Sequence, residues 1–344
     1  LRNKSYYIFN IPYSKKEYQE KLESFDLGSK NNFEKLKVQA YEKWLEFPNK
    51  YIHGSQNVNV SGDYIYESKN AIDCFRVREV EDGKYVQNIT NSPVRDCYDY
   101  SNFGNGAELI YESLIVGSGA YNVKFCSQCF PNNKNLSYSI FCNNSSDLFG
   151  CISVRHKQYC ILNKQYSKEG YEKMSHKIIA HMKQTGEYGE FFPSILSPFP
   201  YQITAAHEFF PKTKEEAGTK GFSWYLVDKQ NHKITIFPKN IPDHIKDLNK
   251  NILDEVIECE HKSTCNHECT GAFRVIEQEV DFLKRMNLPF PRLCTNCRHH
   301  SRLVLRNSPV LYHRTCTCEN YNHVNHKDKK CKAEFETSYA PDRP

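Results

Sequence analysis

Residues 137–162 read SYSIFCNNSSDLFGCISVRHKQYCIL and carry three cysteines nine positions apart. Each cysteine lies close to an aromatic or aliphatic residue, and Asn, Ser, Gly and Asp separate the apolar pieces. Similar fragments recur upstream at less regular distances; the cysteines of the whole series are Cys74, Cys97, Cys126, Cys142, Cys151 and Cys160. Short strands, turn residues and a recurring small apolar residue predict the stacked coils of a β-solenoid, with Cys, Tyr and Phe filling its interior.

Alternatives to a purely structural solenoid remain open in this region. A β-sandwich is the second fold that short strands and turns allow. Cys126 and Cys129 form an isolated C-x-x-C pair, but a separation of three directs side chains of a continuous strand to opposite faces, which favours packing over metal binding. Aspartates in turn-like settings offer carboxylates for glycoside hydrolysis, although Asp is common in turns because of its local hydrogen bonds. They are Asp73, Asp96, Asp99 and Asp147.

Residues 1–18 and 154–171 are similar to each other. Aligned at an offset of 153, they are identical at nine of 18 positions. Each copy has an alternating strand pattern followed by a serine that can cap a helix, and Ser14 with Glu17 forms a capping box. We infer an internal duplication, and expect the strand followed by the capped helix to close one end of the solenoid. Nothing before the first copy corresponds to residues 56–153, which agrees with sequence missing upstream of Leu1.

We expect an α+β chain of four consecutive parts. Residues 1–55 form a strand and helices, including a helix over 31–46 whose apolar stripe is expected in the core. Residues 56–165 form the solenoid. Residues 166–255 contain a helix, an aromatic, proline-rich segment, a hairpin over 222–227 and 233–237, and a helix near 242–253. Residues 256–344 form a zinc-ribbon region.

The C-terminal part contains cysteine pairs at metal-ligand spacing. Cys265 and Cys269 form one knuckle, Cys294 and Cys297 form a second, and 24 residues separate the two. Four thiolates at about 2.3 Å around one ion make a tetrahedral zinc site that can replace part of a core. Between the pairs, residues 276–286 have the apolar spacing of a helix. The spacing therefore predicts one bound Zn²⁺.

The surrounding residues resemble the probable zinc-ribbon domain of uncharacterised bacterial proteins that carry a β-rich region before the ribbon. The resemblance covers about 40 residues: Gly271-Ala272-Phe273 after the first knuckle, Glu277-Gln278-Glu279 at the start of the helix, and Pro291-Arg292-Leu293-Cys294 before the second. It implies zinc and supplies no activity. One departure is the three residues between Cys265 and Cys269, where that family usually has two. Cys259 and His261 are therefore alternative ligands.

A second group of metal-ligand residues follows. It consists of Cys316, Cys318, His323, His326 and Cys331. Proteins with the similar arrangement continue into another C-x-x-C pair. A second zinc site thus closes either with these histidines or with ligands that lie beyond the given sequence.

Composition indicates the compartment. Eight of the 15 cysteines in this 344-residue chain fall in the last 86 residues at metal-ligand spacing, which favours zinc in a reducing cytoplasm over disulfides. No apolar run approaches the ~20 residues of a membrane span, and the given sequence does not open with a charged, apolar and small-residue signal segment. Secretion stays open as an alternative, because residue 1 is Leu and the natural N-terminus can lie upstream. We expect no membrane partner, and the sequence leaves the oligomeric state undetermined.

The net charge is only +5, but the basic residues are unevenly distributed. No acidic residue occurs between Asp281 and Glu319. A helix over 296–306 would place three arginines on one face, a suitable surface for phosphate, with a tyrosine nearby for base stacking. The residues expected to contact nucleic acid are Arg292, Arg298, Arg302, Arg306, Arg314 and Tyr312.

Three functions follow from these patterns. The first is a zinc protein that binds RNA or DNA through the basic helix, with the β-rich region as scaffold. The second is a structural or protein-interaction scaffold in which zinc only stabilises the fold. The third is a metal-dependent enzyme, which ranks last because an all-cysteine site leaves no open metal position. No catalytic residues are predicted.

Overall fold

The computed structural model describes residues 5–47, 49–225, 232–316, 322–323, 326–327 and 331–342. The chain forms two compact units, each assembled from segments distant in sequence. Unit 1 comprises Leu1–Asn49, Ala206–Pro211 and Trp224–Arg306, and unit 2 comprises Lys50–Ala205, Lys212–Ser223 and Asn307–Pro344. The four consecutive parts expected from the sequence are thus interleaved.

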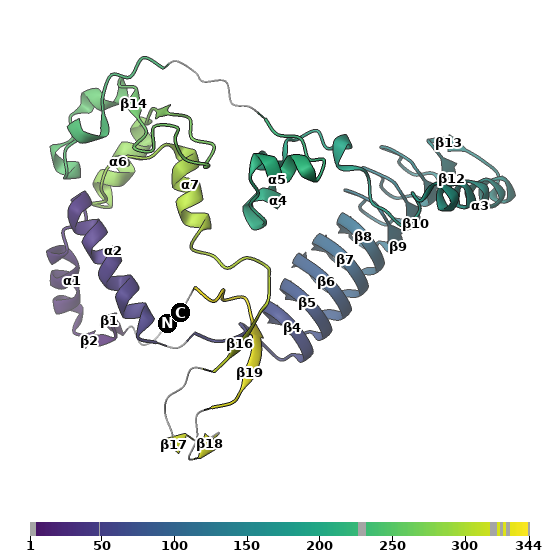
Figure 1. The fold of residues 1–344 in the computed structure, drawn as a ribbon, viewed down its shortest axis with the longest axis horizontal. Helices are drawn as coiled ribbons and strands as arrows, with labels where there is room; N and C mark the ends of the chain where they lie inside the picture. The colour runs from purple at the N-terminus through teal and green to yellow at the C-terminus, as the bar shows by residue number, and fades with distance from the viewer. Residues whose placement is uncertain are drawn as a thin grey trace. The chain divides into compact units, whose positions relative to one another are not determined.

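Unit 2 is built around a β-solenoid, as predicted (Figure 1). One 11-stranded sheet follows the chain order, and all neighbouring strands are parallel except β12 and β13. A sandwich would need two antiparallel sheets, so this alternative is wrong. The strands are β3 (Gly54–Ser55), β4 (Val58–Tyr66), β5 (Lys69–Arg78), β6 (Val80–Asn91), β7 (Val94–Gly104), β8 (Ala107–Gly117), β9 (Tyr121–Lys124), β10 (Lys134–Ser137), β11 (Ser146–Phe149), β12 (Gln158–Ile161) and β13 (Lys164–Gln165).

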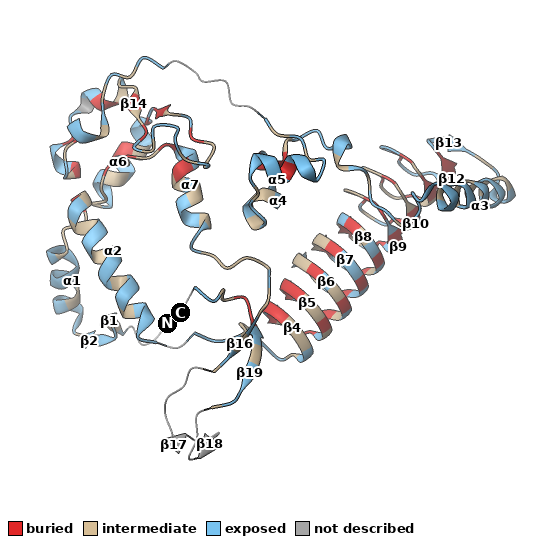
Figure 2. Cartoon of the chain, viewed as in Figure 1, coloured by how far each residue is buried: buried red, intermediate tan, exposed pale blue. Residues whose placement is uncertain are grey.

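The solenoid has a period of three residues within each coil. Ser146 pairs with Gln158 in the next coil, twelve residues further along the chain. A left-handed residue recurs at intervals of three within the coils, as at Asn135, Tyr138 and Phe141, with φ of 56°, 52° and 58°, and the interval lengthens where a coil has more than twelve residues. The residue after each of these points inward: Leu136, Ser139 and Cys142 have no exposed surface. Figure 2 shows the same recurrence of buried positions along β4 to β8. A twelve-residue coil therefore has four inward positions.

This period corrects the expectation for the C-x-x-C pair. Cys126 and Cys129 follow the left-handed residues Phe125 and Gln128, and both thiols are fully buried on the same inner side. The expected opposite faces apply to an extended strand with a period of two, which this chain does not form here. Burial raises the pKa of Cys74 and of Cys97 to about 12, as expected for thiols that serve as packing.

Most of the aromatic residues lie outside the coils, contrary to the expectation of an aromatic interior. Tyr85, Tyr98 and Tyr111 are 41%, 40% and 36% exposed and form an outer row with ring centroids 5.4 Å and 5.6 Å apart. The row continues through Phe125 to Tyr138, whose rings stack at 4.7 Å. Cysteine and aliphatic side chains such as Ile65, Leu136 and Leu148 occupy the interior, and Tyr100 is an aromatic residue there with no exposed surface.

The aspartates considered for hydrolysis occupy left-handed corners. Asp73, Asp96, Asp99 and Asp147 have φ between 50° and 54°. Asp147 accepts hydrogen bonds from Asn135 in the preceding coil (2.9 Å) and from Gln158 in the next (3.1 Å). Asp147 therefore serves hydrogen bonding, as its turn-like sequence setting favoured, but its partners lie in the neighbouring coils and not in its own turn.

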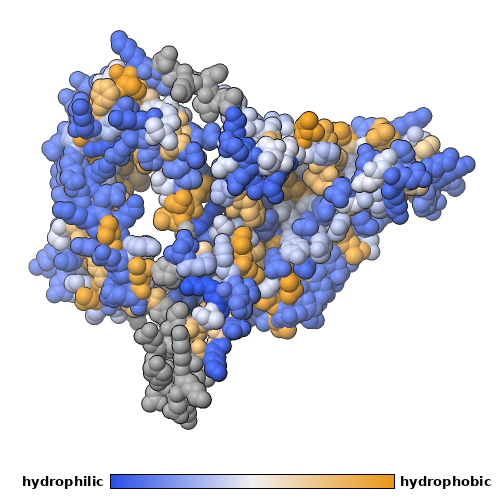
Figure 3. All heavy atoms as spheres, viewed as in Figure 1, coloured by the Kyte–Doolittle hydropathy of each residue, from blue (hydrophilic) through white to orange (hydrophobic). Residues whose placement is uncertain are grey.

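The last coil ends in a hairpin and a helix. Strand β13 turns back antiparallel to β12, and α3 (Lys168–Thr185) begins at Ser167, whose hydroxyl accepts a hydrogen bond from the Gly170 amide (3.1 Å). Tyr171 of α3 contacts Tyr159 of β12, with ring centroids 5.9 Å apart. The capped helix thus follows the solenoid's last coil, and its surface is mainly hydrophilic in Figure 3, where it forms the right-hand end.

The first copy of the repeated sequence has the same local structure. Strands β1 (Tyr6–Ile8) and β2 (Ile11–Tyr13) form a hairpin, and α1 (Lys15–Ser24) starts at a capping box made by Ser14 and Glu17. The two turn residues have φ of 49° and 63° in the first copy, and of 48° and 67° in the second. The Tyr6–Tyr18 ring contact (5.3 Å) corresponds to Tyr159–Tyr171. Similar sequence therefore gives similar structure here, although duplication itself stays a prediction.

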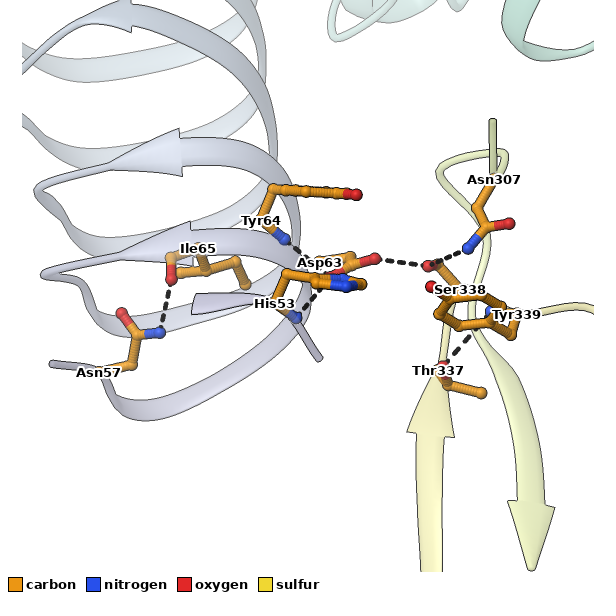
Figure 4. A network of polar contacts seen from close by, with 9 residues as sticks. All are labelled: His53, Asn57, Asp63, Tyr64, Ile65, Asn307, Thr337, Ser338 and Tyr339. Atoms are coloured by element: carbon orange, nitrogen blue, oxygen red, sulfur yellow. Dashed lines mark hydrogen bonds and ion pairs between the residues drawn. The ribbon is translucent and has the colours of Figure 1, made fainter. Parts of the chain in front are cut away.

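The first coil contacts the C-terminal hairpin of unit 2 (Figure 4), in which β16 (Tyr312–Thr315) pairs antiparallel with β19 (Glu334–Thr337). Asp63, only 2% exposed, accepts hydrogen bonds from the backbone amides of His53 (2.7 Å) and Tyr64 (2.9 Å) and from the Ser338 hydroxyl (2.6 Å). The buried carboxylate is thereby satisfied and ties residues far apart in sequence. Strands β17 (Asn322–His323) and β18 (His326–Lys327) form a further short pair.

Several short elements lie between the solenoid and the metal-ligand region. The predicted proline-rich segment forms only single turns, η1 (Ser194–Leu196) and η2 (Tyr201–Ile203), and short helices α4 (Ala205–Phe209) and α5 (Lys214–Thr219) follow. The expected hairpin centres on residues 226–231, which lie outside the described part of the chain. The expected helix near 242–253 is wrong: the segment forms 3₁₀ turns η4 (Ile245–Asp247) and η5 (Lys250–Leu253), because His244 and Asn249 side chains each cap a new turn. Another turn, η3 (Pro238–Asn240), precedes them.

In unit 1, α2 (Lys30–Leu45) matches the helix predicted over 31–46, but its apolar stripe is not in a core. Trp44 is 67% exposed and Tyr41 is 53% exposed. The start of α2 is attached to the rest of the unit: the Ser29 hydroxyl donates to Asp243, and the Ile245 amide donates to the Gly28 carbonyl (2.9 Å). Among the described residues, none of the helices combines the length and apolar character that crossing a membrane requires.

Candidate metal centre

Two pieces of secondary structure bring four cysteines of unit 1 together. Strands β14 (Ile257–Glu258) and β15 (Ala272–Phe273) pair antiparallel, so that Cys259 directly follows β14 and its amide donates to the Gly271 carbonyl (2.8 Å). Helix α7 (Thr295–Leu303) supplies Cys294 as its N-cap residue and Cys297 in its first turn. The hairpin therefore contributes Cys259 and Cys269, and the helix start contributes the other pair.

The four sulfurs have the spacing of a tetrahedral metal site. Their Sγ atoms all lie within 4.8 Å of one another. The Cys259–Cys297 and Cys269–Cys294 sulfurs are each 3.9 Å apart. Zn–S bonds of about 2.3 Å place tetrahedral sulfurs about 3.8 Å from each other. Cys259, Cys294 and Cys297 have no exposed surface, and Cys269 is 9% exposed. These residues can hold a metal ion.

The backbone around the site prepares the sulfurs for a thiolate role. The Cys294 amide donates to the Cys259 sulfur (3.3 Å), and the Gly271 amide donates to the Cys269 sulfur (3.4 Å). Burial opposes ionisation of Cys294, but hydrogen bonds from the Cys297 amide and from Thr270 outweigh it and lower the pKa of this thiol to about 6. Burial raises the pKa of Cys259 to about 11.

The surrounding core fixes the hairpin against the helix. Buried apolar residues pack with the cysteines, including Val280 of α6 (Glu277–Arg285). Gly271 has a φ of 74°, and a Cβ there would lie 2.7 Å from the Ser263 hydroxyl. Glycine is therefore required at the turn that leads into β15.

The structure rearranges the predicted ligand set. Cys259, an alternative ligand in the sequence, joins Cys269, Cys294 and Cys297, and the hairpin register is the reason. Cys265, expected in the first knuckle, lies with its sulfur 3.7 Å from that of Cys297 and forms a second group that includes His261. The strand signal around residues 256–258 was the feature that could have identified Cys259 from sequence.

The second predicted group is only partly described. The Cys316 amide donates to the Ala333 carbonyl (2.9 Å), beside the β16–β19 pair, and Cys331 lies two residues before that carbonyl. Cys318 lies outside the described residues, as do the side chains of His323 and His326. A second zinc site there stays a prediction.

The arginines expected to bind phosphate differ in their surroundings. Arg292 is 7% exposed and donates to the carbonyls of Ile241 (3.0 Å) and Pro242 (2.7 Å), so it serves the core of unit 1. Arg298 forms an ion pair with Glu279 of α6 (2.5 Å). These two side chains are therefore already engaged and are not free to bind phosphate, because the fold brings an acidic residue and backbone carbonyls from other segments next to them.

The remaining predicted contacts are divided between the units. Arg306 lies beyond the end of α7, pairs with Glu208 (3.6 Å) and covers the Phe209 ring at 4.2 Å. Arg302 is exposed on α7. Tyr312 and Arg314 lie on β16 in unit 2, where Arg314 donates to the Ala340 carbonyl (3.4 Å). Helix α7 thus carries one exposed arginine of the expected row.

Comparison of the chain with protein-family models, with curated proteins and with solved structures finds no match.

Proposed function

We propose that this protein is a non-catalytic zinc protein in which Cys259, Cys269, Cys294 and Cys297 hold one structural zinc ion. The observation that carries the proposal is the set of four buried sulfurs at tetrahedral spacing. Thiolate is a preferred ligand of zinc, and four protein ligands leave no position for water or substrate. The resemblance of residues 265–298 to a zinc-ribbon domain supports the same metal.

Zinc in this position stabilises unit 1. The ion joins the β14–β15 hairpin to the start of α7 and adds to the buried apolar contacts that already hold these two segments together. Structural zinc sites contribute about 10–16 kcal/mol in small zinc-finger peptides, which is comparable to the whole stability of a domain. Because cysteines at metal-ligand spacing favour zinc binding in a reducing compartment, we place the protein in the cytoplasm.

The scaffold role rests on the solenoid's outer aromatic row. Tyr85, Tyr98 and Tyr111 are neighbours on successive strands and remain more than a third exposed. Tyrosines that combine apolar area with a hydroxyl are enriched in protein interfaces. The function that we propose is therefore a zinc-stabilised scaffold that presents this row to a protein partner.

Metal removal tests the zinc proposal. The full chain is treated with a chelator at neutral pH, and amide hydrogen exchange is followed in both units. We expect zinc in the purified protein by elemental analysis, and loss of protection in β14, β15 and α7 on chelation, with the solenoid amides unchanged. Absence of zinc, or unchanged protection after its removal, would refute the proposal.

Nucleic-acid binding is the second candidate. It is favoured by the absence of acidic residues between Asp281 and Glu319 and by the exposure of Lys284, Arg285 and Arg302. It is weakened by the partners of Arg292, Arg298 and Arg306. The test is fluorescence anisotropy of labelled RNA and DNA over a salt series, with the variant R285E/R302E compared with K173E/K177E on α3, which makes the same charge change elsewhere. Salt-dependent binding lost only in the first variant would establish this function; no binding at low salt would exclude it.

A further inference from the structure

Beside the four-cysteine centre lies a second group of metal-ligand side chains that shares one residue with it. His261, Cys265, His267 and Cys297 offer ligand atoms that all lie within 4.8 Å of one another. The Cys265 and Cys297 sulfurs are 3.7 Å apart, which is again close to the sulfur–sulfur distance expected for a tetrahedral zinc site. Cys297 therefore belongs to both groups, and its sulfur is 3.9 Å from that of Cys259 on the other side.

Each of the two histidines has a buried ring nitrogen without a hydrogen-bond partner. The Nδ1 atoms of His261 and His267 are buried and have no hydrogen-bond partner. An unpaired buried polar atom is costly, and native structures satisfy nearly all of them. An unprotonated imidazole nitrogen can coordinate a metal ion through its lone pair. The His267 ring also stacks on that of His300, with centroids 3.7 Å apart, which restricts its orientation.

The number of ligand side chains also favours a second ion. Five cysteines converge here, Cys265 in addition to the four of the first centre. A tetrahedral ion takes four ligands, so the Cys265 sulfur and the two imidazoles are left over when the first centre is filled.

We propose that His261, Cys265, His267 and Cys297 bind a second divalent metal ion, and that the Cys297 thiolate bridges the two ions of a binuclear cluster. The inference rests on the proposed four-cysteine centre, because Cys297 is common to both. His267 is then a metal ligand, a function that the sequence pattern did not predict for it. The second ion then fixes the loop of residues 261–267, and the first turn of α7 contributes Cys297 as a ligand to both ions.

The test is the metal stoichiometry of the full chain, measured by native mass spectrometry with Zn²⁺ and separately with Co²⁺. All proteins carry C316S/C318S/C331S, so that the other cysteine group does not contribute. We expect two ions per chain in this background, one in H261A/H267A, and two in the matched control H299A, which alters a neighbouring histidine outside both groups. X-ray absorption should show a metal–metal distance of about 3.5–4 Å, the range found in two-metal sites.

The outcomes separate this inference from the proposed function. One ion per chain, retained in H261A/H267A, overturns the second site and leaves the first intact. No bound metal overturns both. Two ions that persist in H261A/H267A, or two ions without a short metal–metal distance, overturn the bridged cluster. Circular dichroism of each variant confirms that the solenoid is still folded, so that metal loss is not a consequence of global unfolding.

Discussion

Leu148→Ala tests the three-residue period of the solenoid most directly. Leu148 has no exposed surface, and its neighbours in the register are Leu136 in the preceding coil and Cys160 in the next. The substitution removes three buried carbons, which corresponds to about 2.4 kcal/mol of transfer free energy at about 0.8 kcal/mol each. The backbone ladder on both sides prevents the coil from collapsing into the cavity, so the expected total loss is about 4 kcal/mol, within the range for buried leucines.

The assay measures hydrogen exchange of the β10–β12 amides at increasing urea concentrations, which reports the free energy of unfolding of the coils around the substitution. Ile152→Ala is the matched control, because Ile152 lies in the same part of the solenoid but is 55% exposed. We expect the control to lose less than about 1 kcal/mol. Equal losses for the two variants, or a loss below about 1 kcal/mol for Leu148→Ala, would refute the assignment of inward positions.

The other predictions concern the metal centre, an acidic contact and the helix caps. Cys259→Ser should abolish the tetrahedral four-thiolate absorption of the Co²⁺-loaded protein, whereas Cys316→Ser should leave it intact; unchanged absorption in Cys259→Ser would contradict the ligand set. The Ser29 hydroxyl lowers the pKa of Asp243, so the ionised carboxylate contributes stability that is complete above the ordinary carboxyl pKa near 3.8 and is lost as the pH falls through the lower folded value. The protection of the first α2 amides, measured relative to the intrinsic exchange rate at each pH, should therefore fall below about pH 4 in the wild type, while D243N should show low protection at every pH; identical profiles would show that Asp243 does not anchor α2. Ser167→Ala and Ser14→Ala should each cost about 1 kcal/mol in their own helix, α3 or α1, seen as faster exchange of the first-turn amides; no change in either helix would mean that the caps add nothing.

Local sequence patterns determined much of this protein. The turn residues and small apolar residues of 56–165 predict a solenoid correctly, because each coil is built from nearby residues and repeats along the chain. The serine caps of α1 and α3 and the helix over 31–46 were predictable for the same reason: a helix start depends on residues three positions apart. The cysteine pairs likewise indicated a metal module at Cys294 and Cys297.

Only the tertiary structure decided the features that depend on distant residues. The left-handed conformation at every third residue places Cys126 and Cys129 on the same side, and side-chain alternation in an ordinary strand gives the opposite result. The β14–β15 register selects Cys259 for the four-cysteine set, and Cys297 lies between two ligand groups because α7 starts there. Glu279 and Glu208 neutralise arginines that the sequence shows in an acid-free segment. These ion pairs and ligand groups depend on the distances between atoms in the folded protein, and the number of residues between two side chains in the sequence does not determine those distances.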